Sequence, residues 1–211
     1  MAGIFVTFEG VEACGKSTQV KRLKRRLEAA GHEVIAVHEP GFTEIGSEIR
    51  HLLLHAKQGN AMQAVTELLL FEASRAQLVA EVIRPSLAKG SIVLSDRFYD
   101  STTVYQGIAR GLDSTFIRVI NEFVVDECKP ALTILLDIDI ETSLIRQMRR
   151  VRPVGFPDRM ERQPSEFFEK VRQGYLETAR AEPGRIKVVD ASRAEDRVEH
   201  EIWDHVDALL R

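Results

Sequence analysis

The stretch GVEACGKS at positions 10–17 constrains this chain more than any other part of the sequence. It fits the pattern G-x-x-x-x-G-K-[ST], and it lies between an apolar run at 4–8 and an amphipathic stretch at 16–30. Glycines in such a loop let backbone N–H groups turn toward phosphate oxygens, and the start of the helix adds positive potential. The pattern therefore predicts a buried strand, a phosphate-binding loop and a helix, with nucleotide contacts from Gly10, Val11, Glu12, Ala13, Cys14, Gly15, Lys16, Ser17 and Thr18.

Two side chains of the loop have specific chemistry. Lys16 can reach the terminal phosphates of a nucleoside triphosphate, and the Ser17 hydroxyl can ligate Mg²⁺. Asp96 and Arg97 come directly after another apolar run, at 91–95, and parallel sheets bind ligands at the carboxyl ends of their strands. We expect Asp96 to complete the metal site with Ser17. Arg97 is expected to bridge donor and acceptor phosphates, as a catalytic residue beside Lys16.

Short apolar runs at 4–8, 33–38, 91–95, 132–137 and 186–189 alternate with longer helical patterns. Runs that are apolar at successive positions favour strands buried on both faces. We therefore predict an α/β fold of the P-loop type, with a five-stranded parallel sheet flanked by helices. No stretch rich in Ser, Gly and Pro divides the 211 residues, so we expect a single domain over 1–211.

The composition argues against several classes of protein. The net charge is −3, so we expect no broad basic surface for nucleic acid or for a membrane. The apolar runs are far shorter than the roughly 20 residues of a membrane span. We expect a cytoplasmic protein whose two cysteines, Cys14 and Cys128, are free thiols. Because Cys14 would lie near a helix N-terminus and beside Lys16, we also expect it to react with alkylating reagents and to be protected by ATP.

The segment between Arg149 and Pro164 is rich in Arg, Pro and Gly, and it is predicted to be a mobile lid, over about 149–163, rather than part of the sheet. Lys16 is the only cation of the phosphate-binding loop, whereas phosphoryl transfer requires several positive charges around the transferred group. We expect the lid to supply an arginine, and the catalytic candidates are Arg149 and Arg152. The alternative is a solvated basic patch.

Six segments, which together extend over almost the whole chain, resemble the bacterial thymidylate kinases. They are FEGVEACGKST (8–18), HEPGFTEIGSEIRHLLL (38–54), LLFEASRAQLV (69–79), SDRFYDSTTVYQG (95–107), KPALTILLDI (129–138) and DRMERQPSEFFEKVRQGYLE (158–177). The resemblance implies the fold of a nucleoside monophosphate kinase, the use of ATP and Mg²⁺, and transfer of the γ-phosphate of ATP to dTMP. It also implies a homodimer, for which apolar positions in 65–87 and 116–125 could form the interface, although they could equally belong to the core.

The resemblance further implies an acceptor site. In it, Phe71 stacks on the thymine ring and Arg75, on the same helix face, donates to the base. Thr102 contacts the base edge, and Tyr105 crowds the sugar 2′ position and so favours deoxyribose. The full set that the resemblance implies for acceptor binding is Glu12, Glu39, Pro40, Phe71, Arg75, Arg97, Thr102, Tyr105 and Gln106.

The acceptor loop departs from the family pattern R-E-P-G-G-T. His38 and Phe42 stand in place of the arginine and the second glycine. A neutral His38 cannot replace the phosphate contact of an arginine fully, so Arg50 or Arg75 would contribute it instead.

Two other functions remain open from the sequence alone. A deoxynucleoside kinase, or another nucleoside monophosphate kinase, would share the loop and the Asp–Arg pair, and Glu39 could then act as a base on a nucleoside hydroxyl. A P-loop switch or regulatory ATPase would hydrolyse ATP slowly without an acceptor. The N-K-x-D motif of guanine-reading switch proteins does not occur in the sequence.

Overall fold

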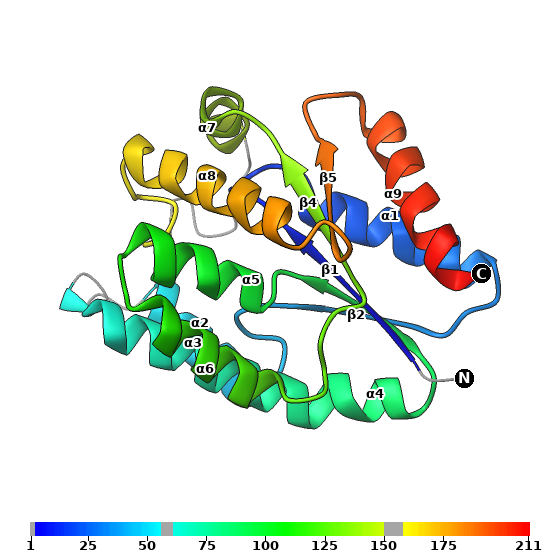
Figure 1. Ribbon diagram of the computed structural model, residues 1–211, viewed down its shortest axis with the longest axis horizontal. Coiled ribbons are helices and arrows are strands. Elements are labelled where there is room, and N and C mark those ends of the chain that lie inside the picture. The colour runs from blue at the N-terminus through cyan, green and yellow to red at the C-terminus, as the bar shows by residue number, and fades with distance from the viewer. Residues whose placement is uncertain (1–2, 56–60, 150–157) are drawn as a thin grey trace.

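The computed structural model describes residues 3–55, 61–149 and 158–211. Its centre is a parallel sheet with the strand order β2-β3-β1-β4-β5, which lies between two layers of helices (Figure 1). The strands are β1 (Ile4–Glu9), β2 (Val34–His38), β3 (Ile92–Asp96), β4 (Leu132–Asp137) and β5 (Ile186–Asp190). The predicted five-stranded parallel sheet is therefore confirmed, and each strand begins and ends within about one residue of its apolar run.

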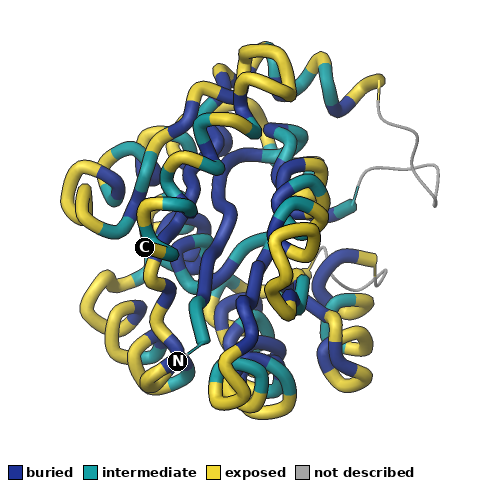
Figure 2. Tube along the Cα trace, turned by 90° about the vertical axis from the view of Figure 1, so that its right-hand side faces the viewer, coloured by how far each residue is buried: buried dark blue, intermediate teal, exposed yellow. Residues whose placement is uncertain are grey.

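The strands form where they do because both of their faces are covered. Val6 and Leu94 belong to the same buried cluster as Leu23 and Leu27 of the first helix. Phe5 and Val93, their neighbours in sequence, belong to a separate cluster that packs around Leu78 and Ile83. Figure 2 shows the sheet as a buried centre surrounded by partly exposed helices. Burial on both faces explains why the strands are apolar at successive positions.

One buried polar contact fixes the register at the middle of the sheet. Thr7 and Thr133 pair across β1 and β4, and their hydroxyl oxygens lie 2.7 Å apart in a hydrogen bond. On the other side of β1, Phe8 pairs with Asp96 of β3. This register places the end of β3 beside the residues that lead into the phosphate-binding loop.

Two helices cover one face of the sheet and the others cover the opposite face or one end of it (Figure 1). The first face holds α1 (Lys16–Ala29) and α9 (Glu195–Leu210). The remaining elements are α2 (Glu44–Leu54), α3 (Ala64–Leu78), the π-helical turn η2 (Val79–Ile83), α4 (Arg84–Ala88), α5 (Tyr99–Thr102), the π-helical turn η3 (Thr103–Ala109), α6 (Ser114–Val125), α7 (Ile140–Arg149) and α8 (Ser165–Ala181). Within the described ranges, no helix is both long and apolar enough to cross a membrane.

Candidate active site

The phosphate-binding loop connects β1 to α1, and both of its glycines are required by the backbone. Gly10 has φ +136°, and a Cβ there would lie 2.4 Å from the carbonyl oxygen of Leu136. Gly15, which precedes α1, has φ +105°. Left-handed conformations of this kind are accessible mainly to glycine. The loop therefore keeps its shape only with glycine at these positions of the motif.

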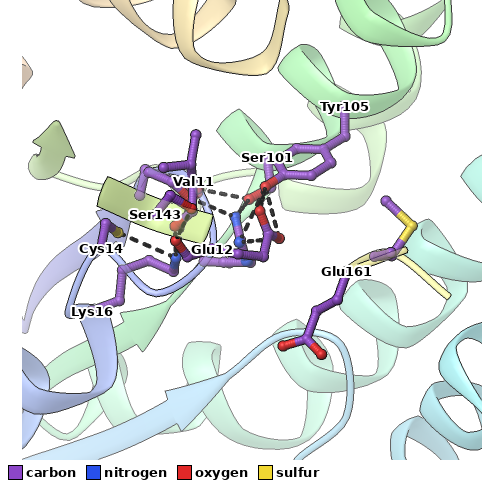
Figure 3. Close-up of polar contacts among 12 residues, drawn as sticks. Val11, Glu12, Cys14, Lys16, Ser101, Tyr105, Ser143 and Glu161 are labelled. Carbon is purple, nitrogen blue, oxygen red and sulfur yellow. Dashed lines mark hydrogen bonds and ion pairs between the residues drawn. The ribbon is translucent and has the colours of Figure 1, made fainter. Parts of the chain in front are cut away.

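Lys16 is held inside the loop. Its ammonium group donates to the carbonyl oxygens of Gly10 and Val11, at 3.1 Å and 2.9 Å, and lies 3.5 Å from the Cys14 thiol (Figure 3). These contacts place a positive charge at the centre of the loop, as the sequence predicted.

Cys14 is less accessible than the sequence suggested. Its side chain is 2% exposed and belongs to the main apolar cluster. A small apolar residue fills this position, so the expected alkylation of the thiol is disfavoured by burial rather than promoted by the helix N-terminus.

Ser17 and Asp96 come together although they are far apart in sequence. The Ser17 hydroxyl donates to the Asp96 carboxylate at 2.5 Å, because β1 and β3 are neighbours and both end at this edge of the sheet. A hydroxyl and a carboxylate are hard oxygen donors that suit Mg²⁺, which takes few protein ligands and completes its shell with phosphate and water oxygens. The donor set therefore fits the predicted metal. No cluster of three or more His, Cys, Asp or Glu side chains occurs among the residues that the structure describes.

Arg97 has a backbone conformation that is unusual for arginine, with φ +74°. Its guanidinium group makes five hydrogen bonds, to the Gly10 carbonyl and to the side chains of Glu12, Ser101, Tyr105 and Tyr175. Burial disfavours its charge, but the oxygens of Tyr105 and Glu12 hold the pKa of Arg97 well above its usual range. Strained residues held in this way are common at functional sites. Arg97 is thus a fixed cation directly beside the phosphate-binding loop.

Three residues that support Arg97 were missed from the sequence. Glu9 is fully buried, and its carboxylate accepts hydrogen bonds from the Ser101 and Tyr175 hydroxyls, each at 2.7 Å. It also accepts from the backbone N–H of Phe98 at 2.7 Å. Burial raises the pKa of Glu9 above its ordinary value, and the neighbouring Asp100 raises it further. The only signal in the sequence is an acidic residue at the end of an otherwise apolar run, directly before the loop.

A cavity of about 660 Å³ opens beside the loop. Every side chain that the sequence assigned to the acceptor site borders it, namely Glu12, Glu39, Pro40, Phe71, Arg75, Arg97, Thr102, Tyr105 and Gln106. The same cavity reaches Lys16, Ser17 and Asp96. Its volume lies within the range of small-molecule sites. The fold therefore brings the acceptor residues and most of the loop to one cavity. Gly10, Val11 and Cys14, which were also predicted to contact the nucleotide, are not among its described lining residues.

Arg75 is the most constrained of these side chains. It is 1% exposed, and it donates to Glu39 at 2.9 Å, to Thr102 at 3.0 Å and to Glu72 of the same helix. Burial raises the pKa of Glu39 to about 7, although the charge of Arg75 opposes this shift. Arg75 engages one oxygen of the Glu39 carboxylate, Oε2, whereas Oε1 is buried without a hydrogen-bond partner among the described residues.

The unusual acceptor loop has a compact packing of its own. His38 and Phe42 pack edge to face, with ring centroids 5.7 Å apart. Burial lowers the pKa of His38 below its ordinary value, and the charge of Arg50 adds to the effect. Arg50 borders the cavity and donates to the Pro40 carbonyl at 2.8 Å, which places a guanidinium group near the acceptor loop.

The arginines predicted for the lid occupy different surroundings. Arg149 ends α7, is exposed, and is not among the described residues that line the cavity. Arg146, one turn earlier, does line it and donates to the Ala191 carbonyl at 3.1 Å. Arg152 lies outside the described residues. The catalytic role of Arg149 or Arg152 therefore stays a prediction.

The described part of the predicted lid, 158–163, packs tightly. Arg159 is 8% exposed, donates to the Leu53 carbonyl at 2.8 Å and pairs with Glu67 at 2.5 Å. Asp158, Met160 and Glu161 border the cavity, and Glu161 lies across it from the loop residues (Figure 3). These contacts join 158–163 to the end of α2 and the start of α3. The lid over about 149–163 stays a prediction, because 150–157 lie outside the described residues.

The parallel sheet, the phosphate-binding loop, the Ser17–Asp96 pair and the adjoining acceptor cavity define a P-loop phosphotransferase of the nucleoside monophosphate kinase type. Residues 8–202 match the sequence profile of the thymidylate kinase family. A thymidylate kinase of Syntrophotalea carbinolica is 49% identical over 201 residues, which cover 94% of this chain and 93% of the relative. A thymidylate kinase of Deinococcus radiodurans is 47% identical, with 95% of each chain covered.

A solved structure gives the same answer. The crystal structure of thymidylate kinase from Ehrlichia chaffeensis superposes with a TM-score of 0.78 at 30% sequence identity, and the match covers 98% of this chain and 99% of that chain. The chain therefore belongs to the thymidylate kinase family.

Proposed function

We propose that this chain transfers the γ-phosphate of ATP to dTMP and releases dTDP and ADP. The observation that carries the proposal is the single cavity in which the phosphate-binding loop, Arg97 and the acceptor residues meet. Membership of the thymidylate kinase family supports the choice of dTMP as the acceptor. Both cysteines are free and buried, which supports the expectation of a reducing compartment such as the cytoplasm.

On the donor side, fixed positive charge and orientation supply the catalysis. Lys16 would neutralise the terminal phosphates of ATP, and Arg97 lies where donor and acceptor phosphates would meet. Arg97 is already oriented by its five hydrogen bonds, so little reorganisation is needed as charge develops on the transferred group. In-line attack by a dTMP phosphate oxygen needs no general base, because this oxygen is already ionised near neutral pH.

Ser17 and Asp96 would hold Mg²⁺. When bound, the ion supplies neutralisation of the β- and γ-phosphate charge. The Ser17 hydroxyl and the Asp96 carboxylate lie beside Lys16 in the same cavity, which supports this assignment.

On the acceptor side, four residues would select thymidylate. Phe71 would stack on the base, while Arg75 and Thr102, which are joined by a 3.0 Å hydrogen bond, would contact its edge. Tyr105 is held by the Glu12 carboxylate at 2.8 Å, so its ring is fixed where it would crowd a ribose 2′-hydroxyl. A nucleoside kinase would need a free carboxylate as base, and the pairing of Glu39 with Arg75 disfavours that alternative.

The proposal is tested by comparing kcat/KM for dTMP, dUMP, dCMP, dGMP, ribothymidine monophosphate and thymidine, each with ATP and Mg²⁺. We expect dTMP to be preferred by at least about tenfold, which corresponds to about 1.4 kcal/mol of differential transition-state binding. Preference for thymidine would identify a nucleoside kinase, and preference for another monophosphate would reassign the acceptor. Hydrolysis of ATP that is independent of every acceptor would favour a regulatory ATPase.

We also propose that the chain forms a homodimer through α3 and α6, which lie side by side (Figure 1). Large apolar side chains are exposed on these two helices, and Phe123 is 84% exposed. The set is Val65, Leu69, Phe116, Val119 and Phe123. Several large exposed apolar side chains on two neighbouring helices are more typical of an interface than of a free surface.

A further inference from the structure

A second cavity, of about 330 Å³, lies between the start of α3, the end of η3 and the turn before α8. We call it the arginine pocket. Its described lining residues are Met62, Ala64, Glu67, Arg110, Arg159, Arg162 and Gln163, and none of them lines the larger cavity. It is therefore separate from the proposed site of phosphoryl transfer.

Positive charge exceeds negative charge in the arginine pocket. Three arginines line it together with one carboxylate, that of Glu67. Glu67 is 1% exposed, accepts from Arg110 at 3.2 Å and pairs with Arg159 at 2.5 Å. One carboxylate neutralises one of the three guanidinium charges, so two remain uncompensated among the lining residues. The nearby Asp158 is not a lining residue, and its carboxylate accepts from the backbone N–H groups of Met160 and Glu161.

Arg159 has a buried donor without a partner. Its Nε donates to the Leu53 carbonyl and its Nη1 pairs with Glu67. Its Nη2 is buried and has no hydrogen-bond partner in the part of the chain that the structure describes. A buried guanidinium N–H without an acceptor is unfavourable, so Arg159 is left with unsatisfied hydrogen-bonding capacity in the wall of the pocket.

We propose that the arginine pocket binds a compact anion of the phosphate class with two or more negative charges, such as pyrophosphate or the terminal phosphates of a nucleotide. Planar guanidinium groups match phosphate oxygens in pairs. The Gln163 side chain, in the same wall, accepts from Arg110 at 3.0 Å and so orients this arginine. Arg162 is exposed at the pocket, and among the described residues the one hydrogen bond of its side chain runs from Nε to the Asp158 carbonyl at 3.3 Å. It is the arginine whose other N–H groups are most available to an anion.

The pocket also contacts the acceptor side of the larger cavity. Glu67 accepts a hydrogen bond of 2.8 Å from Gln106, which lines that cavity. An anion that competes with Glu67 for Arg110 or Arg159 would therefore act one hydrogen bond away from the acceptor site.

The test is calorimetric titration of pyrophosphate into the protein saturated with ADP and dTMP, so that the larger cavity is filled. We expect one equivalent to bind, with affinity at least tenfold weaker in Arg162→Ala and unchanged in Arg180→Ala. Arg180 is an exposed arginine of α8 outside the pocket, and its removal changes the net charge equally. Thermal unfolding of both variants checks that each is folded.

A parallel titration with dTTP distinguishes free pyrophosphate from a nucleotide as the source of the anion, and Arg162-dependent binding of either supports the site. The proposal is overturned if neither anion binds the saturated protein, or if Arg162→Ala binds them as tightly as the unchanged protein. Calorimetry measures binding and not turnover. The proposed anion site can therefore fail this test while the proposed phosphoryl transfer stands.

Discussion

Replacing Tyr175 by Phe removes one hydroxyl from behind the proposed site without removing a residue that lines the cavity. This hydroxyl donates to Glu9 at 2.7 Å, accepts from Arg97 at 3.2 Å and lies 2.9 Å from the Ser101 hydroxyl. In Tyr175→Phe, Arg97 keeps four of its five hydrogen bonds, and Glu9 loses one of the two hydroxyl donors to its carboxylate.

The magnitude follows from these contacts. Loss of a hydrogen bond to a buried charged group costs about 1.5–3 kcal/mol, so we expect about 2 kcal/mol of lost stability. Looser placement of Arg97 is expected to lower kcat about tenfold, equivalent to about 1.4 kcal/mol, with little change in the KM for ATP.

Urea unfolding and steady-state ADP formation measure the two effects on the same preparation. Tyr99→Phe is the matched control, because the Tyr99 hydroxyl makes no hydrogen bond to any residue that the structure describes. If Tyr175→Phe loses the expected unfolding free energy of about 2 kcal/mol but keeps its kcat, Tyr175 does not position Arg97. Unchanged stability would refute the hydrogen-bond network itself.

Three further predictions concern the metal, the acidity and the assembly. Ser17→Ala and Asp96→Asn are each expected to lower kcat by about 100-fold. Both should also raise the Mg²⁺ concentration that gives half of the maximal activity, which a metal titration measures. An unchanged Mg²⁺ requirement would show that the ion binds elsewhere. Burial raises the pKa of Glu39 from 4.5 to about 7. Between these two pH values the folded protein keeps the carboxyl proton of Glu39, whereas the unfolded chain releases it. The free energy of unfolding therefore falls as the pH rises from 4.5 to about 7. The urea concentration at half unfolding should therefore fall less steeply with rising pH in Glu39→Gln than in the unchanged protein. Equal slopes for the two proteins would contradict the raised pKa of Glu39. Phe123→Asp is expected to give a monomer by light scattering, whereas a retained dimer would place the interface elsewhere.

The sequence specifies most of the fold because its strands are buried on both faces. In a run such as 132–137 both faces of the strand are buried and almost every residue is apolar. The strand therefore begins and ends where the apolar run begins and ends. The phosphate-binding loop was equally clear, because its function requires particular residues at fixed spacing. The π-helical turns were not predicted, since each one shifts the apolar spacing by a single position within a stretch of only five or seven residues, which is too short to show a change of period. One of them, Thr103–Ala109, carries Tyr105 and Gln106 to the cavity.

The supporting shell of the site could not be predicted for a different reason. Glu9, Ser101 and Tyr175 are joined by hydrogen bonds across separations of 92 and 166 residues, and no local pattern marks such contacts. Arg159 shows the same limit. Nothing in its Pro- and Gly-rich surroundings indicates that it pairs in the interior with Glu67, which lies 92 positions earlier in the chain.

Transfer of phosphate from ATP to thymidylate can be followed by incubating the protein with ATP labelled in the γ-phosphate, dTMP and Mg²⁺, and by separating the products. We expect the label to appear in dTDP in amounts equal to the ADP formed, and Arg97→Ala to lower its rate of appearance by at least about 100-fold. Label in inorganic phosphate, with no labelled dTDP, would contradict this transfer.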